Sequence, residues 1–368
     1  MTDLLARLAG ELELDLDSGG APVNPVVVLE LARWQQAPPA VIGQAAGLVA
    51  QALPVTVGVL PGPCPPSLRP LAAALSLTLT DSTPAQATVR DVLLPVSDIP
   101  GRPGLGDAVS RLRAAAGQSP RAAVACGQLL RQTPALGTTA GLAAEAAAYS
   151  TLLGGPEFGR WRAARGPRSG RRPPAEPVRV TRDGARLSVI LADPERRNPF
   201  STTVREALLD AFRLAEADDT ISRVELSGAG PAFCSGGHLD EFGRATDLAS
   251  AYLVRLSRAP WRVLDRIAGK VTVRAHGACI GAGTELLAYA GRVTAAPDAF
   301  FQLPEVRMGL VPGAGGSVSV PRRIGRHRAA WLMISGDRLP AGTALRWGLV
   351  DDLDTRGAPA SGLPGAEG

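Results

Sequence analysis

Short stretches of alternating apolar and polar residues, each followed by a turn, mark the second half of the chain. They cover residues 187–193, 222–228 and 271–277. A period of two residues is typical of a strand with one buried face. Between the first two stretches the apolar residues instead share one face of a helix, and they are Val204, Ala207, Leu208, Ala211, Phe212 and Leu214. Strands alternating with helices predict an α/β fold with helical crossovers.

Further helices are expected around these strands. Thr203 and Glu206 have the spacing of a capping box, which would place the start of the first helix there. The run AGTELLAYAG (282–291) reads as a helix after the third strand, and further helices are predicted at 327–335 and 341–348.

Proline and glycine divide the chain into four parts. With 368 residues the chain is too long for one ordinary core. Residues 167–177 are rich in Arg, Pro and Gly and predict a linker, and the breaker-rich segment 354–368 predicts a disordered tail. We therefore expect an N-terminal region at 1–166 and a core domain at 178–353.

The net charge of +5 changes this picture little, although it raises the question of nucleic acid. Every basic residue apart from the histidines is Arg except Lys270, and the densest run, at 160–172, is interleaved with Gly, Pro and Ser. Such a run is more typical of a solvated linker than of a nucleic-acid arm, and no recognition motif accompanies it. We expect no nucleic-acid partner.

The location of the protein is predicted from what its sequence lacks. Residues 1–20 have neither the basic start nor the apolar centre of a signal peptide. The sequence contains no charge-free stretch of about 20 apolar residues, so no membrane span is predicted. The cysteines have no metal or redox spacing, and they are Cys64, Cys126, Cys234 and Cys279. The histidines are too scattered to suggest a metal site. We expect a cytoplasmic protein without membrane partners, metal or cofactor.

Two glycine-rich turns carry the first candidate chemistry. FCSGGHLDEF (233–242) and HGACIGAGTELL (276–287) each follow a predicted strand. Backbone N–H groups that face one point from two such turns would form an oxyanion hole. Tight packing of a helix on a strand explains a GAG sequence equally well.

Two glutamates are candidates for acid–base chemistry. Glu285 lies in the first turn of the helix after the second glycine-rich turn, and Glu305 lies in FQLPEVRMGLVPGAGG. A buried glutamate among apolar neighbours has a raised pKa, and two of them can divide the acid and base roles. Taken singly, either glutamate fits a solvated surface position better.

Four motifs in order resemble the crotonase (enoyl-CoA hydratase/isomerase) superfamily. They are AFCSGGHL, GACIGAGTELLAYAGRVTAA, DAFFQLPEVRMGLVPGAGGSVSVPRRIG and WGLVDDL, at 232–239, 277–296, 298–325 and 347–353. The resemblance implies a ββα spiral core with surrounding helices, a homotrimer or hexamer, and an acyl-CoA substrate without any cofactor. It assigns the oxyanion N–H groups to Gly237 and Ala282, and the two glutamates of a hydratase to Glu285 and Glu305.

The resemblance also places the coenzyme A (CoA) moiety beside the first turn, where this chain departs from the pattern. Gly236, His238 and Leu239 match CoA-lining positions, but His238 replaces an acidic or polar residue and Asp240 a basic one. Arg196 and Arg197, in the loop DPERRNPFS, are candidates for the missing positive charge, although a solvated turn explains them as well. Ala282 stands where the family usually has Gly.

The N-terminal region resembles parts of the same family in an unusual order. After 353 only residues 354–368 remain, whereas family members continue with several helices. Residues 108–166 look like those helices, and 53–62 and 73–81 look like faint strand copies. We interpret 1–166 as a degenerate crotonase half that is catalytically dead and docks its helices on the core through Ala143, Ala147 and Leu152. An unrelated helical extension is the alternative.

Three classes of function follow. An enoyl-CoA hydratase leads, because both glutamates are present. Another crotonase reaction is the second, namely isomerisation, thioester hydrolysis, or cofactor-free oxygenation as in dihydroxyphenylacetyl-CoA dioxygenases, which also carry long N-terminal extensions. The third is a non-catalytic partner subunit.

Overall fold

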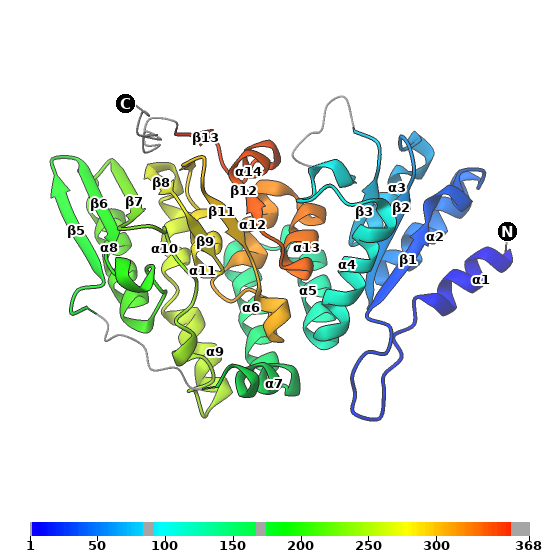
Figure 1. Cartoon of the computed structure of the whole chain (residues 1–368), viewed down its shortest axis with the longest axis horizontal. Helices are drawn as coiled ribbons and strands as arrows, with labels where there is room; N and C mark the ends of the chain where they lie inside the picture. The colour runs from blue at the N-terminus through cyan, green and yellow to red at the C-terminus, as the bar shows by residue number, and fades with distance from the viewer. Residues whose placement is uncertain (1, 84–91, 167–173, 355–368) are drawn as a thin grey trace, which may run out of the picture.

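The computed structural model describes residues 2–83, 92–166 and 174–354 (Figure 1). Figure 1 shows an elongated molecule with a sheet toward each end and helices from both halves of the chain between them. Most of the expected linker at 167–177 and nearly all of the expected tail at 354–368 lie outside the described residues.

The N-terminal half contains a parallel four-stranded sheet in the order β1-β2-β3-β4. Its elements are α1 (Thr2–Glu11), β1 (Val26–Glu30), α2 (Pro39–Gln51), β2 (Val55–Leu60), α3 (Arg69–Ala74), β3 (Leu77–Thr80), β4 (Leu94–Pro95), α4 (Leu105–Gln118), α5 (Pro120–Gln132), α6 (Thr138–Leu153) and α7 (Pro156–Arg165), with short 3₁₀ turns at Leu31–Trp34, Pro66–Leu68, Val96–Asp98 and Thr133–Ala135.

Both faces of this N-terminal sheet are covered. Every residue of β2 and β3 is buried, as expected for strands between two helical layers. Helices α1 to α3 close one face with a small core of their own, to which α2 contributes Ile42, Ala45 and Val49 at helical spacing. Helices α4 and α5 lie against the other face. The strands predicted within 53–62 and 73–81 therefore exist, whereas their descent from a second crotonase half stays a hypothesis.

The C-terminal half begins with strands and ends with helices. Its elements are β5 (Val178–Asp183), β6 (Arg186–Leu191), α8 (Thr202–Ala217), β7 (Arg223–Gly228), α9 (Leu248–Ser257), α10 (Pro260–Arg266), β8 (Val271–Ala275), β9 (Ala278–Ile280), α11 (Ala282–Leu287), β10 (Arg292–Ala295), β11 (Phe300–Gln302), α12 (Gly316–Ile324), α13 (Arg326–Ser335), β12 (Leu339–Pro340), α14 (Ala341–Trp347) and β13 (Asp352–Leu353), with 3₁₀ turns at Pro194–Arg196, Leu239–Glu241, Ala268–Lys270 and Glu305–Met308 (η8).

Two sheets meet at a corner in this half. The larger has the order β13-β10-β8-β7-β6-β5, parallel except for β5, and the smaller has the order β12-β11-β9. The chain passes from β8 into β9 at Gly277, where φ is +52° and a Cβ atom would lie 2.1 Å from the carbonyl oxygen of Pro231. Only glycine fits such a turn. Repeated strand–strand–helix units of this kind form the expected ββα spiral.

The three predicted strands and the predicted helices of this half are confirmed, as β6, β7, β8, α8, α11, α13 and α14. The predicted capping box is wrong, because Ser201 caps α8 by accepting a hydrogen bond from Val204 N at 3.2 Å. Leu214 was placed on the buried face but is 46% exposed. The buried face of α8 includes Leu209 and Ala215 instead. The predicted set of buried residues is therefore wrong at the C-terminal end of the helix.

Helices of the N-terminal half pack directly on the C-terminal half. α4 and α5 contact α13, and α6 contacts α9, α10 and α12. One hydrophobic core runs through both halves. The docking face predicted for α6 is right only at Leu152, which is buried, because Ala143 is half-buried and Ala147 is exposed. The other buried residues of α6 are Gly141, Leu142, Glu145, Ala146, Tyr149 and Ser150. The alanine-rich sequence of α6 has too weak a period to show its face.

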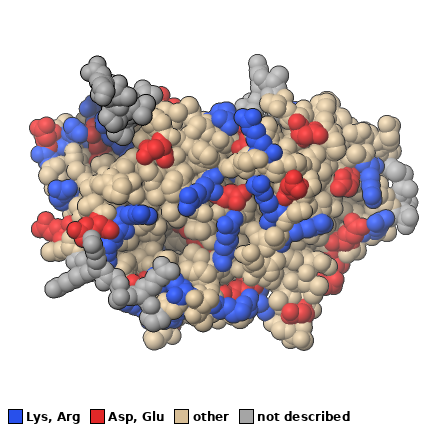
Figure 2. Space-filling model, viewed as in Figure 1, with Lys and Arg blue, Asp and Glu red and all other residues tan. Residues whose placement is uncertain are grey.

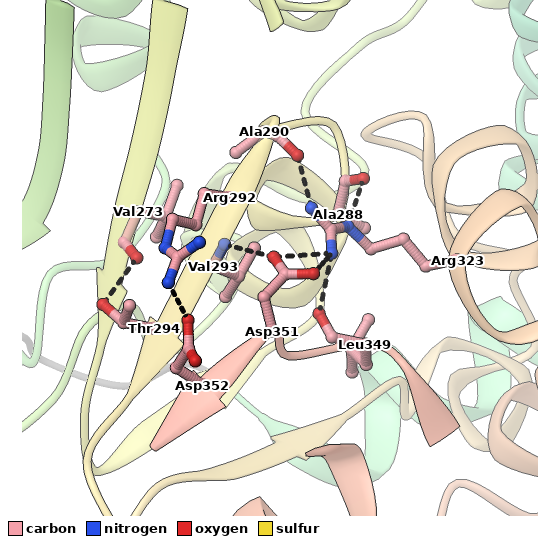
Figure 3. Close-up of polar contacts among 10 residues, drawn as sticks. All are labelled: Val273, Ala288, Ala290, Arg292, Val293, Thr294, Arg323, Leu349, Asp351 and Asp352. Carbon is pink, nitrogen blue, oxygen red and sulfur yellow. Dashed lines mark hydrogen bonds and ion pairs between the residues drawn. The ribbon is translucent and has the colours of Figure 1, made fainter. Parts of the chain in front are cut away.

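The last motif, WGLVDDL, ties the end of the described chain to the sheet (Figure 3). Val293 N donates to Asp351 Oδ2 at 2.7 Å, and Asp351 N donates back to Val293 O at 2.8 Å. Arg323 of α12 reaches Asp351 at 3.2 Å and donates to the carbonyls of Ala288, Ala290 and Leu349. Figure 3 also shows Arg292 paired with Asp352 across β10 and β13. These contacts hold α12, which starts at the site described below.

The charged side chains on the face in view are of both signs, and Figure 2 shows acidic and basic side chains mixed over it. Among the described residues no helix is both long and apolar enough to cross a bilayer.

Candidate active site

The two glycine-rich turns are joined by backbone hydrogen bonds. Cys234 N donates to Ala278 O at 3.1 Å, and Ile280 N donates to Cys234 O at 2.9 Å. Gly236 has φ +93°, and a Cβ atom there would lie 3.1 Å from the carbonyl oxygen of Ile280. This close approach, which requires glycine, brings the residues after each turn to the same cavity.

Gly237 and Ala282, the predicted oxyanion donors, both line a cavity of about 450 Å³. Within the described part of the chain neither backbone N–H donates to a protein oxygen. Ala282 is the first residue of α11, where helix geometry leaves the N–H free, and its φ is not positive. Alanine in place of the usual glycine is therefore compatible with a donor role.

Glu285 lines this cavity from the first turn of α11 and is 2% exposed. Its Oε2 accepts hydrogen bonds from Ala314 N at 2.7 Å and Gly316 N at 2.8 Å. Burial raises the pKa of Glu285 well above its usual value, the charges of Glu305 and Glu145 raise this pKa further, and the two N–H groups oppose the rise. The two hydrogen bonds therefore hold the Oε2 atom of Glu285 in place.

Glu305 opens η8 directly after β11 and reaches the same cavity. Gly281 lies against it, because a Cβ atom on Gly281 would be 2.6 Å from Glu305 Oε1. Its buried Oε2 has no hydrogen-bond partner among the described residues. Burial raises the pKa of Glu305 to about 8. Burial therefore favours the protonated form of Glu305.

A third buried carboxyl group, not found from the sequence, belongs to Glu145 of α6. Its Oε1 accepts from Gly315 N at 2.7 Å, and its Oε2 accepts from Ser317 N at 2.8 Å and Ser317 Oγ at 2.7 Å. Burial raises the pKa of Glu145 to about 7, against the lowering effect of these hydrogen bonds and of Arg255. Glu145 is the lone charged residue of α6, and nothing near it in the sequence indicates a buried partner.

The walls of the cavity come from both halves of the chain. Tyr149 and Leu153 of α6 line it together with Val254 and Arg255 of α9. The guanidinium of Arg255 lies 3.6 Å from the centre of the Tyr149 ring, and its Nη1 donates to Gly313 O at 3.3 Å. A mostly apolar cavity with convergent polar groups at one side is the usual form of a small-molecule site. No group of residues suited to hold a metal ion occurs in the described chain.

The predicted CoA-side residues lie next to this cavity but do not line it. Arg196 is paired with Asp193 at 2.6 Å and contacts His238 Nε2 at 3.2 Å. Arg197 is exposed, with φ +61°. Gly236 and Leu239 flank Gly237 on the same loop. The structure thus brings the four catalytic and oxyanion candidates together and leaves a CoA role for these five residues as a prediction.

Two contacts near the first turn had not been expected. The buried side chain of Asn198 donates to the carbonyls of Ala229, Ala232 and Phe233, which holds the loop before the turn. Asp240, which stands where the resemblance expects a basic residue, is paired with Arg165 of α7 at 2.9 Å. The Arg165 guanidinium lowers the pKa of Asp240.

Known proteins similar to this chain match its C-terminal half. The sequence profile named "Enoyl-CoA hydratase/isomerase" matches residues 183–358. A 1,2-epoxyphenylacetyl-CoA isomerase of Escherichia coli is 34% identical over 45% of this chain and 64% of its own length. A 2,3-dehydroadipyl-CoA hydratase of the same organism is 31% identical over 47% of this chain and 68% of its own length.

The chain belongs to the enoyl-CoA hydratase/isomerase family. A solved enoyl-CoA hydratase from Thermoplasma volcanium is 32% identical, covers 49% of this chain and 72% of its own, and superposes with a TM-score of 0.45. The family profile starts in β5, so Glu145, Tyr149 and Leu153 lie outside it. In this member of the family, residues beyond the matched region complete the walls of the cavity.

Proposed function

We propose that the protein is an enoyl-CoA hydratase, which adds water across the α,β-double bond of an acyl-CoA thioester. The observation that supports this best is the presence of two buried carboxyl groups, Glu285 and Glu305, in one cavity with two unpaired backbone N–H groups. Hydration needs a base for the water and an acid for the α-carbon, and two carboxyl groups in different environments supply both.

The different surroundings of the two glutamates suggest their roles. Burial raises the pKa of both groups, but Glu285 accepts two N–H hydrogen bonds at the start of α12 that stabilise its anion. Glu305 instead has a buried oxygen without a donor among the described residues. Because neighbouring carboxyl groups titrate as a unit, the pair shares its protons. We therefore assign the base to Glu285 and the acid to Glu305.

The reaction then balances as follows. The water oxygen bonds to the β-carbon while a water proton passes to Glu285. The π electrons move to the α-carbon, which takes the proton of Glu305, and a proton returning from Glu285 to Glu305 restores the pair. In between, negative charge develops on the thioester oxygen. The N–H groups of Gly237 and Ala282 stabilise it, an effect worth about 3–4 kcal/mol per donor in comparable sites.

The test is hydration of crotonyl-CoA by the full chain, which is measured as the loss of the absorbance of the enoyl thioester. Glu285→Gln and Glu305→Gln are each expected to lower turnover by about 10²–10⁴-fold, the range of acid–base catalysis. In the unmodified protein, kcat/KM should fall as the pH rises through about 8, where Glu305 loses its proton. Glu225→Gln, at the partly exposed partner of Arg186, serves as the control and should be neutral. Unchanged hydration in either glutamate variant would refute the paired mechanism.

An isomerase is the second candidate, because one of the relatives carries that activity. Isomerisation moves a proton within the substrate and needs no water, so one carboxyl group is sufficient. Mass-spectrometric analysis of products from a panel of acyl-CoA thioesters separates the two reactions. A hydratase adds the mass of one water and an isomerase adds none, while thioester hydrolysis releases CoA and oxygenation adds oxygen. A non-catalytic subunit would leave every thioester unchanged.

A further inference from the structure

The turn before α12 is held by two carboxyl groups from opposite halves of the chain. Four consecutive N–H groups point alternately to one or the other. Ala314 N and Gly316 N donate to Glu285, and Gly315 N and Ser317 N donate to Glu145, at 2.7–2.8 Å. The two glutamates therefore bind interleaved donors of one short segment.

The segment has no means of capping itself. The residue that precedes α12 is Gly315, which has φ +88° and no side chain to accept from the free N–H groups. A Cβ atom there would lie 2.5 Å from the hydroxyl of Tyr289, and one on Gly316 would lie 2.6 Å from Glu285 Cγ. Glycines permit the turn, and the two glutamates supply the acceptors at its positive helix end.

The N-terminal half makes one more contact with the same segment. Thr133 Oγ1 donates to Ser317 O at 2.6 Å, and both residues are buried. Loss of the Glu145 carboxylate would leave the N–H groups of Gly315 and Ser317 buried without acceptors, and the segment would have to move. Any such movement carries the donors of Glu285 with it, because they are the adjacent N–H groups.

The charge of Glu145 also acts on the cavity. The titratable groups that interact with it or share its surroundings are Glu285, Glu305, Arg255, Tyr149, Tyr289 and Cys126. Among these, Arg255 is a cation. An anion at Glu145 raises the pKa of both Glu285 and Glu305. It therefore helps the pair to keep its proton.

We infer that Glu145 is a positioning residue of the active site, which reaches across from the N-terminal half to fix the 314–317 turn and, through it, the carboxyl group of Glu285. This inference rests on the proposed function for its effect on turnover. Its effect on the two cavity carboxyl groups is independent of any substrate.

The chain contains a matched control for a purely structural cap. Glu157 is 4% exposed and accepts hydrogen bonds from Arg121 N at 2.9 Å and Ala122 N at 3.1 Å, in the first turn of α5. It does not line the cavity. Glu157→Gln thus removes the same charge from the same kind of site, without contact with the 314–317 turn.

The experiment uses the full chain and two readouts. The first is the titration of the glutamate carboxyl carbons by ¹³C NMR in the free protein, assigned with Glu285→Gln and Glu305→Gln. Glu145→Gln is expected to move the titration of both cavity groups to lower pH, because it removes a neighbouring anion. Glu145→Asp, which keeps the charge on a shorter side chain, should leave them nearly in place, and Glu157→Gln should not move them.

The second readout is the kinetics of the acyl-CoA reaction. Glu145→Gln should lower kcat by about 10–100-fold, the loss seen for outer groups that orient metal ligands, with KM changed much less. In Glu145→Gln the pH above which the rate falls should be lower than in the unmodified protein. Glu145→Asp should restore that pH. Glu157→Gln should leave kcat and that pH unchanged.

The outcomes separate the two proposals. An unmoved titration in Glu145→Gln overturns the inference, as does a moved titration with wild-type kcat. If the unmodified protein hydrates no enoyl-CoA, the proposed function fails, and the titration alone decides whether Glu145 sets the state of Glu285. If Glu145→Gln does not fold, Glu145→Asp decides. The inference then stands only if Glu145→Asp has a lower kcat while the pH above which its rate falls stays unchanged.

Discussion

Gly281 has no side chain, and this leaves room for the carboxyl group of Glu305 beside it. The residue has φ +49° and ψ −121°, a conformation that side chains disfavour, and Glu305 Oε1 would lie 2.6 Å from any Cβ atom. The next residue, Ala282, has a side chain and a helical start. Position 281 thus requires a residue without a side chain, whereas position 282 in the same turn accepts one.

These requirements give a residue-scale prediction. Gly281→Ala should lower kcat/KM by about 100-fold, the cost of displacing a catalytic group by about 1 Å. Ala282→Gly should keep near-normal activity and cost about 1 kcal/mol of stability, as Gly does relative to Ala in a helix. Steady-state kinetics and thermal unfolding of both variants provide the check. A folded Gly281→Ala protein with normal kcat/KM would mean that the position of Glu305 is unimportant.

Residues that belong to local motifs could be predicted, and those that act across the chain could not. Glu285, Glu305, Gly237 and Ala282 each stand in a short motif that one local window of sequence contains, although Glu285 also binds Ala314 and Gly316, 29 and 31 positions away. Glu145 binds Gly315 from 170 positions away. Nothing near Glu145 in the sequence indicates that partner, and a lone Glu among alanines is the usual pattern of a solvent-facing helix position.

At the scale of elements, α7 is connected to the loop that follows the first glycine-rich turn. Arg162 Nη1 donates to Gly243 O at 2.8 Å, and Arg165 pairs with Asp240. Asp240 stands where the resemblance expects a basic residue, and the structure pairs it with the guanidinium of Arg165. A helix of the N-terminal half therefore compensates for a departure in the core.

The consequence can be measured through substrate affinity. Arg165→Ala should expose the charge of Asp240 and raise KM for the acyl-CoA about two- to fivefold, the size expected of a partly exposed ion pair, with kcat unchanged. Adding Asp240→Asn in the same chain should return KM toward normal. If the double variant is no better than the single one, repulsion by Asp240 is not the cause.

Element prediction followed the strength of the local pattern. β6, β7 and β8 alternate clearly and were found, as was the amphipathic α8. The strands of the small sheet have two or three residues each, too few to show a period, and α9 has no fully buried residue to mark a face. These elements are formed by pairing with distant segments, so a single local window could not reveal them.

At the scale of the whole molecule, the two halves share one core and one site. α5 and α6 cover α12 and α13 in the middle of the molecule, between the two sheets (Figure 1). Arg326 of α13 also donates to Leu75 O at 2.7 Å, at the end of α3. Separation would expose an apolar surface on each half that isolated proteins rarely tolerate.

A divided protein tests this dependence. Residues 178–368 alone should be insoluble or inactive, and co-expression with 1–166 should restore part of the activity, measured on the same thioester as the full chain. Size-exclusion chromatography should show the proposed trimer or hexamer for the full chain and its loss in the fragment. A soluble and fully active fragment would show that the N-terminal half is an independent appendage.

The long separation between Glu145 and its partners has a consequence for how the protein is made. At typical rates of synthesis, about 170 residues take roughly 10 to 30 seconds, during which α6 is complete and the turn at 314–317 does not yet exist. Until then the carboxylate can only be hydrated, because burying it without a donor is costly. The N-terminal half therefore cannot bury Glu145 until the segment 314–317 has been synthesised. A chain that ends before residue 315 therefore lacks both backbone N–H donors of Glu145.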